Sequence, residues 1–256
     1  PRVSDGSLLF IQHLISKMET QGSRIGIVFN GSPLFTGDSG SGESEIRKWI
    51  IENDWLECVV SLPDQMFFNT PISTYIWIVT NNKRPNRKGK IQLIDGSPFF
   101  KMMKKSLGDK RKLIDNSHRE KILQTYNEFE ENEYSKIFDN EFFGYTKVTV
   151  EQPKVENGQV IRDKKGNPKP DSKLRDHERV PLSEDIEKYF SREIEPYLPN
   201  SWIDFDKSKK GYEINFTKYF YKYKPLRSFK DITHDLLELD KESKNLLNQI
   251  VDYGEI

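Results

Sequence analysis

The sequence predicts an α/β fold, in which an open sheet ends in an antiparallel hairpin and is followed by a mostly helical C-terminal region. The runs 24–29 and 56–62 are nearly all apolar, and the helix-like segment 43–53 separates them, as expected of buried parallel strands. Two further β runs, 73–80 and 90–94, are joined by a short basic turn. This arrangement predicts an antiparallel pair at a sheet edge.

Three regions follow from the pattern along the chain. The first helix is predicted over 7–20, where Leu8, Ile11, Ile15 and Met18 recur at helical spacing. Residues 1–98 hold the sheet, 99–182 form a mixed insert and 183–256 form a helical tail. Within the insert, residues 150–180 are polar, and Asn157-Gly158 is either the turn of a hairpin or part of a solvated loop.

Composition excludes several classes of protein. Forty basic residues balance forty acidic ones, so contact with nucleic acid requires a local patch or a partner. Cys58 is the single cysteine, which excludes an internal disulfide and a Cys-based metal site. The four histidines are scattered, and none has metal-ligand spacing. No apolar run approaches the roughly 20 residues that span a bilayer, and no signal peptide is visible, so the expected location is the cytoplasm.

The start of the sequence predicts a piece of a larger protein. The chain begins Pro1-Arg2-Val3 without Met, and a helical pattern starts within a few residues. We therefore expect that half of the sheet lies upstream.

The strand ends provide the candidate binding residues, because ligands of open parallel sheets bind beyond the carboxyl ends of the strands. The first strand ends at Asn30, and the second is followed by a loop that carries Phe67 and Phe68. Exposed loop aromatics are suited to stacking on a base. The alternative for either ring is that it anchors the loop in the core.

A basic cluster between the last two strands is a candidate contact for a phosphate backbone. It contains Arg84, Arg87 and Lys88, and cationic side chains of this kind neutralise phosphates. A solvated turn is the alternative. No phosphate-binding loop of the dinucleotide or Walker type is present.

The last segment has the clearest periodicity of the chain. Steps of three and four form a heptad seam over about three heptads, which is typical of a helix that pairs with another helix. Packing on its own domain is the alternative. The apolar residues of the seam are Phe229, Ile232, Leu236, Leu239, Leu246 and Ile250.

Short motifs follow one another in a fixed order along almost the whole chain. They include Asn30-Gly31-Ser32-Pro33-Leu34-Phe35, together with the segments 3–10, 42–54, 62–68, 72–77, 87–90, 180–193 and 211–216. In order and spacing they resemble the modification subunit of type I restriction-modification systems, an adenine-specific DNA methyltransferase.

The resemblance implies the C-terminal half of a Rossmann-like methyltransferase sheet and transfer of a methyl group from S-adenosylmethionine to adenine N6 in DNA. In this family an Asn-Pro-Pro-Phe/Tyr motif polarises the amino group of a base that has been flipped out of the stack. That motif is absent here, because Asn-Pro occurs only at Asn167-Pro168. We therefore expect no catalytic residue and no main donor-binding motif in this chain, which should be inactive alone.

The same resemblance assigns roles to the strand-end residues. Phe67 or Phe68 would stack on the flipped adenine, and Asn30 would line the cleft as the other part of the target-base pocket. Pro71 stands where the family usually carries glycine, which puts in doubt the roles of its neighbours Asn69 and Thr70.

The resemblance also implies partners. These are DNA, a specificity subunit that reads the DNA sequence, and a restriction subunit in the full complex. The helix over 229–250 is the best candidate for the specificity-subunit contact. The alternative functions are a non-catalytic interaction or scaffold fragment, and a similar methyltransferase that acts on RNA or protein.

Overall fold

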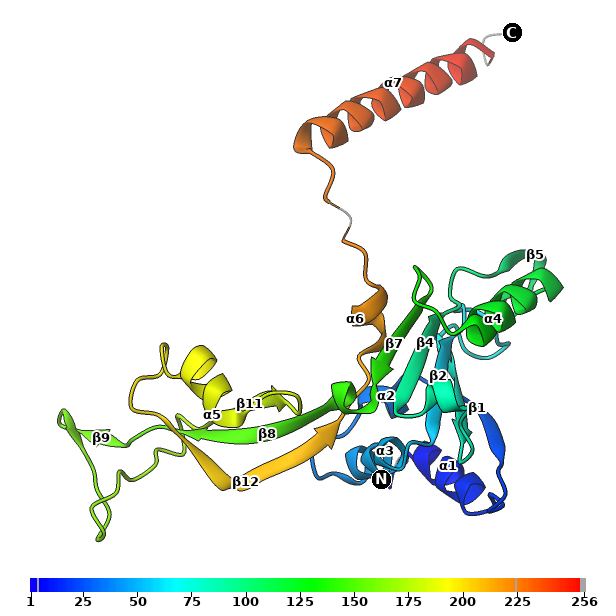
Figure 1. Cartoon of the computed structure of the whole chain (residues 1–256). Helices are drawn as coiled ribbons and strands as arrows, with labels where there is room; N and C mark the ends of the chain where they lie inside the picture. Colours follow the sequence, from blue (N-terminus) through cyan, green and yellow to red (C-terminus); the bar gives the residue numbers. More distant parts are fainter. Residues whose placement is uncertain (4, 224, 254–256) are drawn as a thin grey trace. The chain divides into compact units, whose positions relative to one another are not determined.

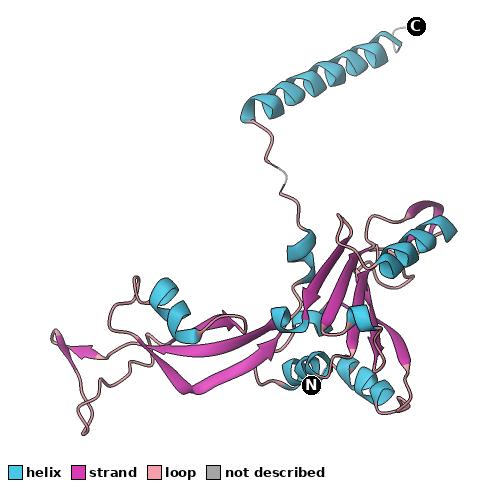
Figure 2. Ribbon diagram, viewed as in Figure 1, coloured by secondary structure: helices cyan, strands magenta, loops and turns pink. Residues whose placement is uncertain are grey.

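The computed structural model describes residues 1–3, 5–223 and 225–253, with side chains described as far as residue 247. The chain divides into two compact units, Pro1–Phe220 and Tyr221–Ile256 (Figure 1). The first unit combines helices with strands, as Figure 2 shows, so the α/β class is as predicted. No helix in the described part of the chain is long and apolar enough to cross a membrane.

The main sheet has five strands in the order β1-β3-β2-β4-β7. These are β1 (Arg24–Asn30), β2 (Leu56–Ser61), β3 (Thr74–Thr80), β4 (Lys90–Asp95) and β7 (Ser135–Asp139). Strand β3 is antiparallel to both β1 and β2, β4 is parallel to β2, and β7 is antiparallel to β4. The strands predicted from the sequence are therefore present, but their order in the sheet differs.

Two expectations about the sheet are wrong. Strands β3 and β4 do not form an edge hairpin, because β2 lies between them. Strand β2 is buried along its whole length, as a central strand should be. Strand β1 lies at an edge of the described sheet and is exposed at alternate residues, so it is not a strand buried on both faces.

Helices α1 (Ser7–Ile15) and α3 (Gly42–Glu52) cover one face of this sheet. Both were predicted from helical spacing, although α1 ends before residue 20. The Ser41 side chain accepts a hydrogen bond from Ser44 N at 3.4 Å and caps α3. Apolar residues of both helices pack with β1, β2, β3 and β4 in the larger core cluster of the protein.

Helix α4 (Asn116–Glu128) covers the other face over β2 and β4. Asp115 begins the helix, and its side chain accepts a hydrogen bond from His118 N. Ile122 and Tyr126 of this helix pack on Cys58, Val60 and Ile94. The helix does not reach β1, where Val28 remains 50% exposed.

A second sheet has three strands in the order β11-β8-β12. These are β8 (Gly144–Glu151), β11 (Asp176–Pro181) and β12 (Trp202–Tyr212). Strands β9 (Val155–Glu156) and β10 (Gln159–Val160) form a small hairpin. The hairpin alternative for Asn157-Gly158 is therefore confirmed, with positive φ at both residues.

The predicted three-way division of the chain differs from the structure. Strand β7 of the predicted insert pairs with β4 of the main sheet, so no boundary separates the two near residue 98. The predicted helical tail contains α5 (Ile186–Tyr189), η3 (Phe190–Ile194) and α6 (Phe216–Phe220), but also the long strand β12. The second unit contains one long helix, α7 (Phe229–Tyr253).

Candidate functional site

The carboxyl ends of three strands meet at one edge of the main sheet. Asn30, the last residue of β1, pairs with Thr74 at the start of β3, and Ser61 of β2 pairs with Tyr75. Because β4 is parallel to β2, Asp95 lies beside Ser61 at the same edge. The sequence-based expectation that the first two strands end at a common edge is therefore confirmed. We call this region the carboxyl edge.

Two side chains at the carboxyl edge are held within the protein. The Ser61 hydroxyl donates a hydrogen bond to the Asp95 carboxylate at 2.8 Å, and Ser97 N donates to the same oxygen at 3.1 Å. Tyr75 is buried, and its pKa is raised by burial and by the negative charge of Asp95. Oδ1 of Asp95 therefore accepts both bonds, and Oδ2 has no hydrogen-bond partner among the described residues.

Asn30 places an exposed amide at this edge. Its side-chain oxygen accepts a hydrogen bond from Ser32 N at 3.1 Å, which fixes the turn into helix α2 (Ser32–Phe35). Its amide nitrogen has no hydrogen-bond partner among the described residues, and the residue is exposed. The position therefore offers a donor for a ligand at the end of β1.

The loop between β2 and β3 presents two exposed rings at the same edge. Leu62 N donates to Thr74 O at 2.8 Å, and Gln65 N donates to Pro71 O at 3.1 Å. These bonds close the loop, and Phe67 and Phe68 at its tip are 37% and 61% exposed. Neither ring belongs to the hydrophobic core clusters of the described residues, which favours a free ring over a core anchor.

A hairpin that sequence reasoning missed holds this loop in place. It consists of β5 (Lys101–Leu107) and β6 (Lys110–Leu113). The backbone N–H groups of Arg111 and Lys112 donate to Gln65 O at 3.0 and 3.2 Å, and Asp109 N donates to Phe68 O at 3.0 Å. The sequence signal was the Gly108-Asp109 pair between two short runs, which is a recognised hairpin turn.

Gly108 is required at the point where the hairpin meets the loop. Its φ is +59°, and a Cβ atom there would lie 2.5 Å from Phe68 O. Both the backbone conformation and the close approach therefore favour glycine.

Cations of the hairpin contact aromatic rings beside the loop. The Lys110 ammonium lies 5.3 Å from the centre of the Phe68 ring, and the Lys112 ammonium lies 4.1 Å from the centre of the Phe100 ring. Lys112 also forms an ion pair with Asp64. The Phe68 ring is thus braced by a cation while most of its surface stays accessible.

Comparison with known proteins identifies the family. The model of the family described as N-6 DNA Methylase matches residues 1–153, more than half of the chain. The chain belongs to this family. The resemblance stated from the sequence motifs is therefore confirmed.

The curated relatives of this N-6 DNA methylase chain are type I methylase subunits. The HindI methylase subunit of Haemophilus influenzae is 35% identical over 109 residues, which is 43% of this chain and 24% of that protein. The MjaIX methylase subunit of Methanocaldococcus jannaschii is 28% identical over 161 residues, which is 63% of this chain and 27% of that protein. The chain matches about a quarter of the length of these relatives.

Among solved structures, a type I restriction-modification methyltransferase subunit from Streptococcus thermophilus is similar to this N-6 DNA methylase chain. It superposes with a TM-score of 0.49 at 27% sequence identity. The match covers 56% of this chain and 28% of that structure.

The basic cluster predicted to contact DNA lies at the opposite end of the strands, after β3 and before β4. Arg87 is 2% exposed and donates hydrogen bonds to the Gln92 side chain and to the Tyr126 carbonyl. Its guanidinium also lies 4.3 Å from the ring centres of Tyr126 and Phe129. The assignment of Arg87 to a phosphate is therefore wrong, because the side chain is committed to the interior. Arg84 and Lys88 are exposed.

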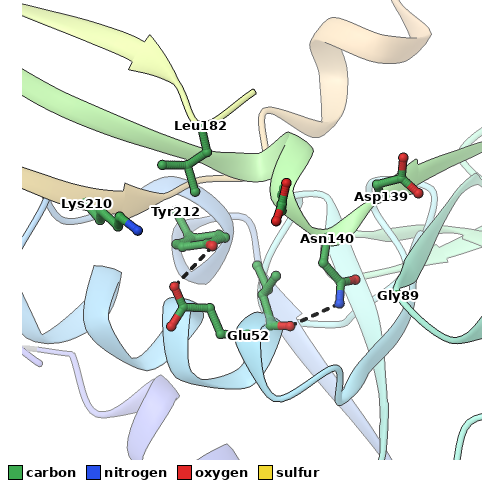
Figure 3. Close-up of a pocket in the computed structure, with 9 residues that line it drawn as sticks. Glu52, Gly89, Asp139, Asn140, Leu182, Lys210 and Tyr212 are labelled. Atoms are coloured by element: carbon green, nitrogen blue, oxygen red, sulfur yellow. Dashed lines mark hydrogen bonds between the residues drawn. The ribbon is translucent and has the colours of Figure 1, made fainter. Parts of the chain in front are cut away.

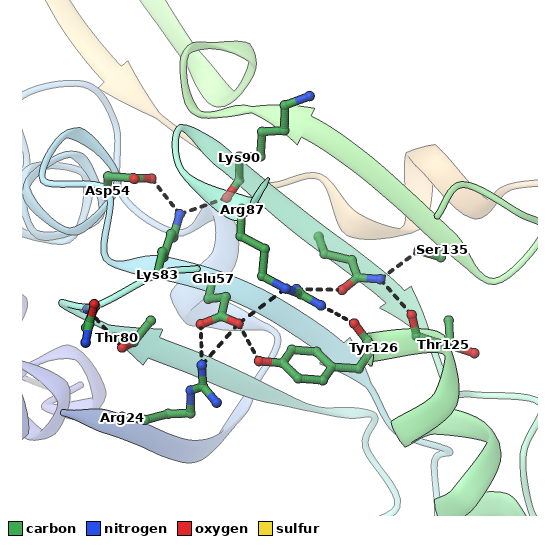
Figure 4. A network of polar contacts seen from close by, with 12 residues as sticks. Arg24, Asp54, Glu57, Thr80, Lys83, Arg87, Lys90, Thr125, Tyr126 and Ser135 are labelled. Atoms are coloured by element: carbon green, nitrogen blue, oxygen red, sulfur yellow. Dashed lines mark hydrogen bonds and ion pairs between the residues drawn. The ribbon is translucent and has the colours of Figure 1, made fainter. Parts of the chain in front are cut away.

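Figure 4 shows the buried polar network that contains Arg87. Glu57, on β2, accepts from Arg24 at 3.1 Å, from the Tyr126 hydroxyl, and lies 3.6 Å from Arg87. Lys83 donates to Asp54 at 2.6 Å in the same region. These charges are paired with one another, and they stabilise the attachment of β1, β2 and α4 to one another.

A hollow at this opposite end is a poor candidate for the active region. It is lined by Glu52, Asp139, Glu141, Lys210 and Tyr212, among others (Figure 3). The Tyr212 hydroxyl donates to Glu52 at 3.2 Å, and burial together with this carboxylate raises the pKa of Tyr212. Three carboxylates repel a polyanion, so the hollow does not suit nucleic acid.

Metal ligands are not clustered in the described residues: no group of three or more His, Cys, Asp or Glu side chains could hold an ion there. Cys58 is fully buried on β2, and burial raises the pKa of its thiol. This residue therefore belongs to the core, as the apolar run around it predicts.

The predicted partner helix is present as α7. Its seam residues Phe229, Ile232, Leu236, Leu239 and Leu246 are 85%, 42%, 62%, 60% and 60% exposed. Ile250 lies in the helix, but its side chain is outside the described residues. The heptad pattern therefore corresponds to a helix with an exposed apolar stripe.

Proposed function

We propose that this chain forms the target-base side of a DNA adenine-N6 methyltransferase, the modification subunit of a type I restriction-modification system. The observation that carries the proposal is the exposed Phe68 ring, placed at the carboxyl edge of a chain from the N-6 DNA methylase family. A base extruded from the duplex needs an aromatic surface and a polar group for its edge. Phe68 supplies the first and the Asn30 amide the second.

Of the two adjacent rings, Phe68 is the better stacking surface. It is 61% exposed, against 37% for Phe67. Its backbone carbonyl is bonded to Asp109 N, and Lys110 lies near its ring. A ring that is fixed before binding loses less conformational entropy when the base arrives.

The donor S-adenosylmethionine is assigned to other parts of the whole protein. The sequence contains no phosphate-binding loop of the dinucleotide or Walker type. The sequence also contains no Asn-Pro-Pro-Phe/Tyr motif. We therefore expect the 256-residue chain, which lacks this catalytic motif, to be inactive alone.

The free edge of β1 is the proposed junction with the rest of the sheet. In the described chain this edge has no paired strand, and Val28 beside it is 50% exposed. Unpaired strand edges with apolar neighbours are places where a further strand adds. The relatives are about four times as long as the matched region, which leaves ample chain for the donor-binding half.

The proposed partners are DNA, a specificity subunit and, in the full complex, a restriction subunit. The exposed stripe on α7 is assigned to the specificity subunit, because an apolar seam of this length suits a helix–helix contact. The matched family favours DNA over RNA or protein as the substrate.

The test is methyl transfer by the full-length subunit assembled with its specificity subunit. Labelled S-adenosylmethionine and duplex DNA that contains the recognition site are the substrates. Phe68→Ala should lower the rate of methylation at least about fivefold, because stacking contributes roughly 1–3 kcal/mol per base. Phe67→Ala should have a smaller effect.

Phe205→Ala is the matched control, because Phe205 is 53% exposed on β12 in the second sheet. If Phe68→Ala and Phe67→Ala both remain folded and methylate DNA at the parent rate, the target-base assignment is wrong. That result would support the alternative of a non-catalytic scaffold fragment. Methylation by the 256-residue chain without other subunits would contradict the expected inactivity.

A further inference from the structure

The β5–β6 hairpin is strongly basic in a chain whose net charge is zero. Between residues 101 and 113, one carboxylate, Asp109, stands against six basic side chains, which are Lys101, Lys104, Lys105, Lys110, Arg111 and Lys112. Like charges on neighbouring strands repel each other. The local excess of positive charge therefore lowers the stability of the isolated hairpin. The stability of the hairpin does not explain why so many basic residues are present, whereas binding to an anionic partner would.

Three of these cations have no ion-pair partner in the part of the chain that the structure describes. Lys104, Lys105 and Arg111 are exposed and form no ion pair with any residue that the structure describes. By contrast, the exposed Arg192 pairs with Glu184 and Glu193. The free cations of the hairpin are thus available to a polyanion.

The position of the hairpin indicates which polyanion it meets. Its turn is bonded to the backbone of Phe68, and Lys110 lies beside the Phe68 ring. A nucleotide joins its base to its phosphate through a single sugar. A base on Phe68 therefore brings its own phosphate, and those of its neighbours, close to the hairpin.

We propose that the β5–β6 hairpin binds the phosphate backbone of the DNA strand that carries the target base, through Lys104, Lys105 and Arg111. This inference rests on the proposed function and extends it from the base to the backbone. The contact is electrostatic and independent of sequence, so it fixes the strand in register without reading bases. An acidic protein surface is the competing occupant, and the test below separates the two.

The experiment measures DNA affinity against salt concentration. The full-length subunit, assembled with its specificity subunit, is titrated with fluorescent duplex DNA that contains the recognition site. Each phosphate contact contributes about 0.9 to the slope of log K against log salt. The variant Lys104→Gln/Lys105→Gln/Arg111→Gln should reduce that slope by about 2 to 3 units. Between 50 and 200 mM salt, the parent should then lose about 40-fold more affinity than the variant.

The matched control is Lys164→Gln/Lys165→Gln/Lys173→Gln, because these three cations are exposed and lie in the polar segment near the second sheet. It should leave the salt slope within half a unit of the parent. If the triple hairpin variant does not fold, Lys104→Gln/Lys105→Gln replaces it and should reduce the slope by about 2 units.

The proposal is overturned if the hairpin variant keeps the parent slope. If the hairpin variant no longer binds the specificity subunit in the absence of DNA, whereas the control variant does, the hairpin contacts an acidic protein surface instead. Failure of the proposed function gives a different result. In that case Phe68→Ala would methylate DNA at the parent rate, whatever salt slope the hairpin variant has.

Discussion

Glu57 and Arg87 form an ion pair inside the protein, with Glu57 Oε1 and Arg87 Nε 3.6 Å apart and both side chains at most 2% exposed. Glu57 lies on β2, and Arg87 lies in η1 (Pro85–Arg87), the turn before β4. Strands β3 and β4 are not neighbours in the sheet, because β2 lies between them. The Glu57–Arg87 pair therefore links β2 to the turn that leads from β3 to β4.

Removal of one partner of this pair should destabilise the protein. Glu57→Gln leaves the Arg87 charge buried, and breaking a buried pair costs about 3–5 kcal/mol. Equilibrium urea unfolding of the full-length protein measures the change. The double variant Glu57→Gln/Arg87→Met should be more stable than Glu57→Gln, because no unpaired charge remains in the interior. A double variant that is less stable than Glu57→Gln would contradict this account.

Tyr126 should give the free energy of unfolding a distinct pH dependence. Burial, and then the hydrogen bond to Glu57, raises the pKa of Tyr126 to about 12. Between the unfolded value near 10 and about 12, the unfolded state releases a proton that the folded state keeps, so stability falls as pH rises through this window.

The comparison of Tyr126→Phe with the parent tests this dependence. The variant should lose less stability between pH 10 and about 12, as measured by urea unfolding at successive pH values. Tyr221→Phe is the control, since Tyr221 is 73% exposed. Identical pH profiles for Tyr126→Phe and the parent would refute the assignment.

Arg47 should be important for the stability of the contact of helix α3 with helix α2 and strand β12. This side chain of α3 is 1% exposed and donates to Pro33 O at 3.1 Å, to Thr36 O at 2.7 Å and to Tyr212 O at 2.7 Å. Burial lowers its pKa to about 10, which leaves it charged at neutral pH. Arg47→Met should lower the free energy of unfolding by about 3 kcal/mol, because each bond to a charged group contributes roughly 1.5–3 kcal/mol.

Lys48→Met on the same helix is the control for Arg47. Lys48 forms a partly exposed pair with Glu45 at 3.7 Å, so its loss should cost less than about 1 kcal/mol. Equal losses for Arg47→Met and Lys48→Met in urea unfolding would show that the buried carbonyl contacts are not important for stability.

The strands and helices of the main sheet were largely predictable, whereas their order was not. Apolar runs and helical spacing report local burial, so α1, α3, β1, β2, β3 and β4 were found near their observed places. The insertion of β3 between β1 and β2 is a long-range pairing, which the local pattern does not encode. For the same reason β12 was taken for part of a helical tail.

The candidate site was predicted in part. Asn30, Phe67 and Phe68 were chosen because they lie at or after strand ends. The structure places them at one edge, and their binding roles stay a prediction. Arg87 was misjudged, because the sequence shows a charge but not its burial. The β5–β6 hairpin was missed because its exposed, basic strands lack the alternating apolar residues that mark a half-buried strand.

The exposed stripe of α7 should be the contact with the specificity subunit. Leu236 lies in the heptad seam and is 62% exposed, whereas Leu237 is 57% exposed and lies outside the seam. Leu236→Lys should weaken association of the full-length subunits at least about tenfold, since loss of a central apolar contact commonly costs about 2 kcal/mol or more. Isothermal titration calorimetry measures the affinity. Leu237→Lys introduces the same charge one position away and should change it little. Equal weakening by both variants would mean that the seam is not the interface, because a contact along one face must distinguish positions about 100° apart on the helix.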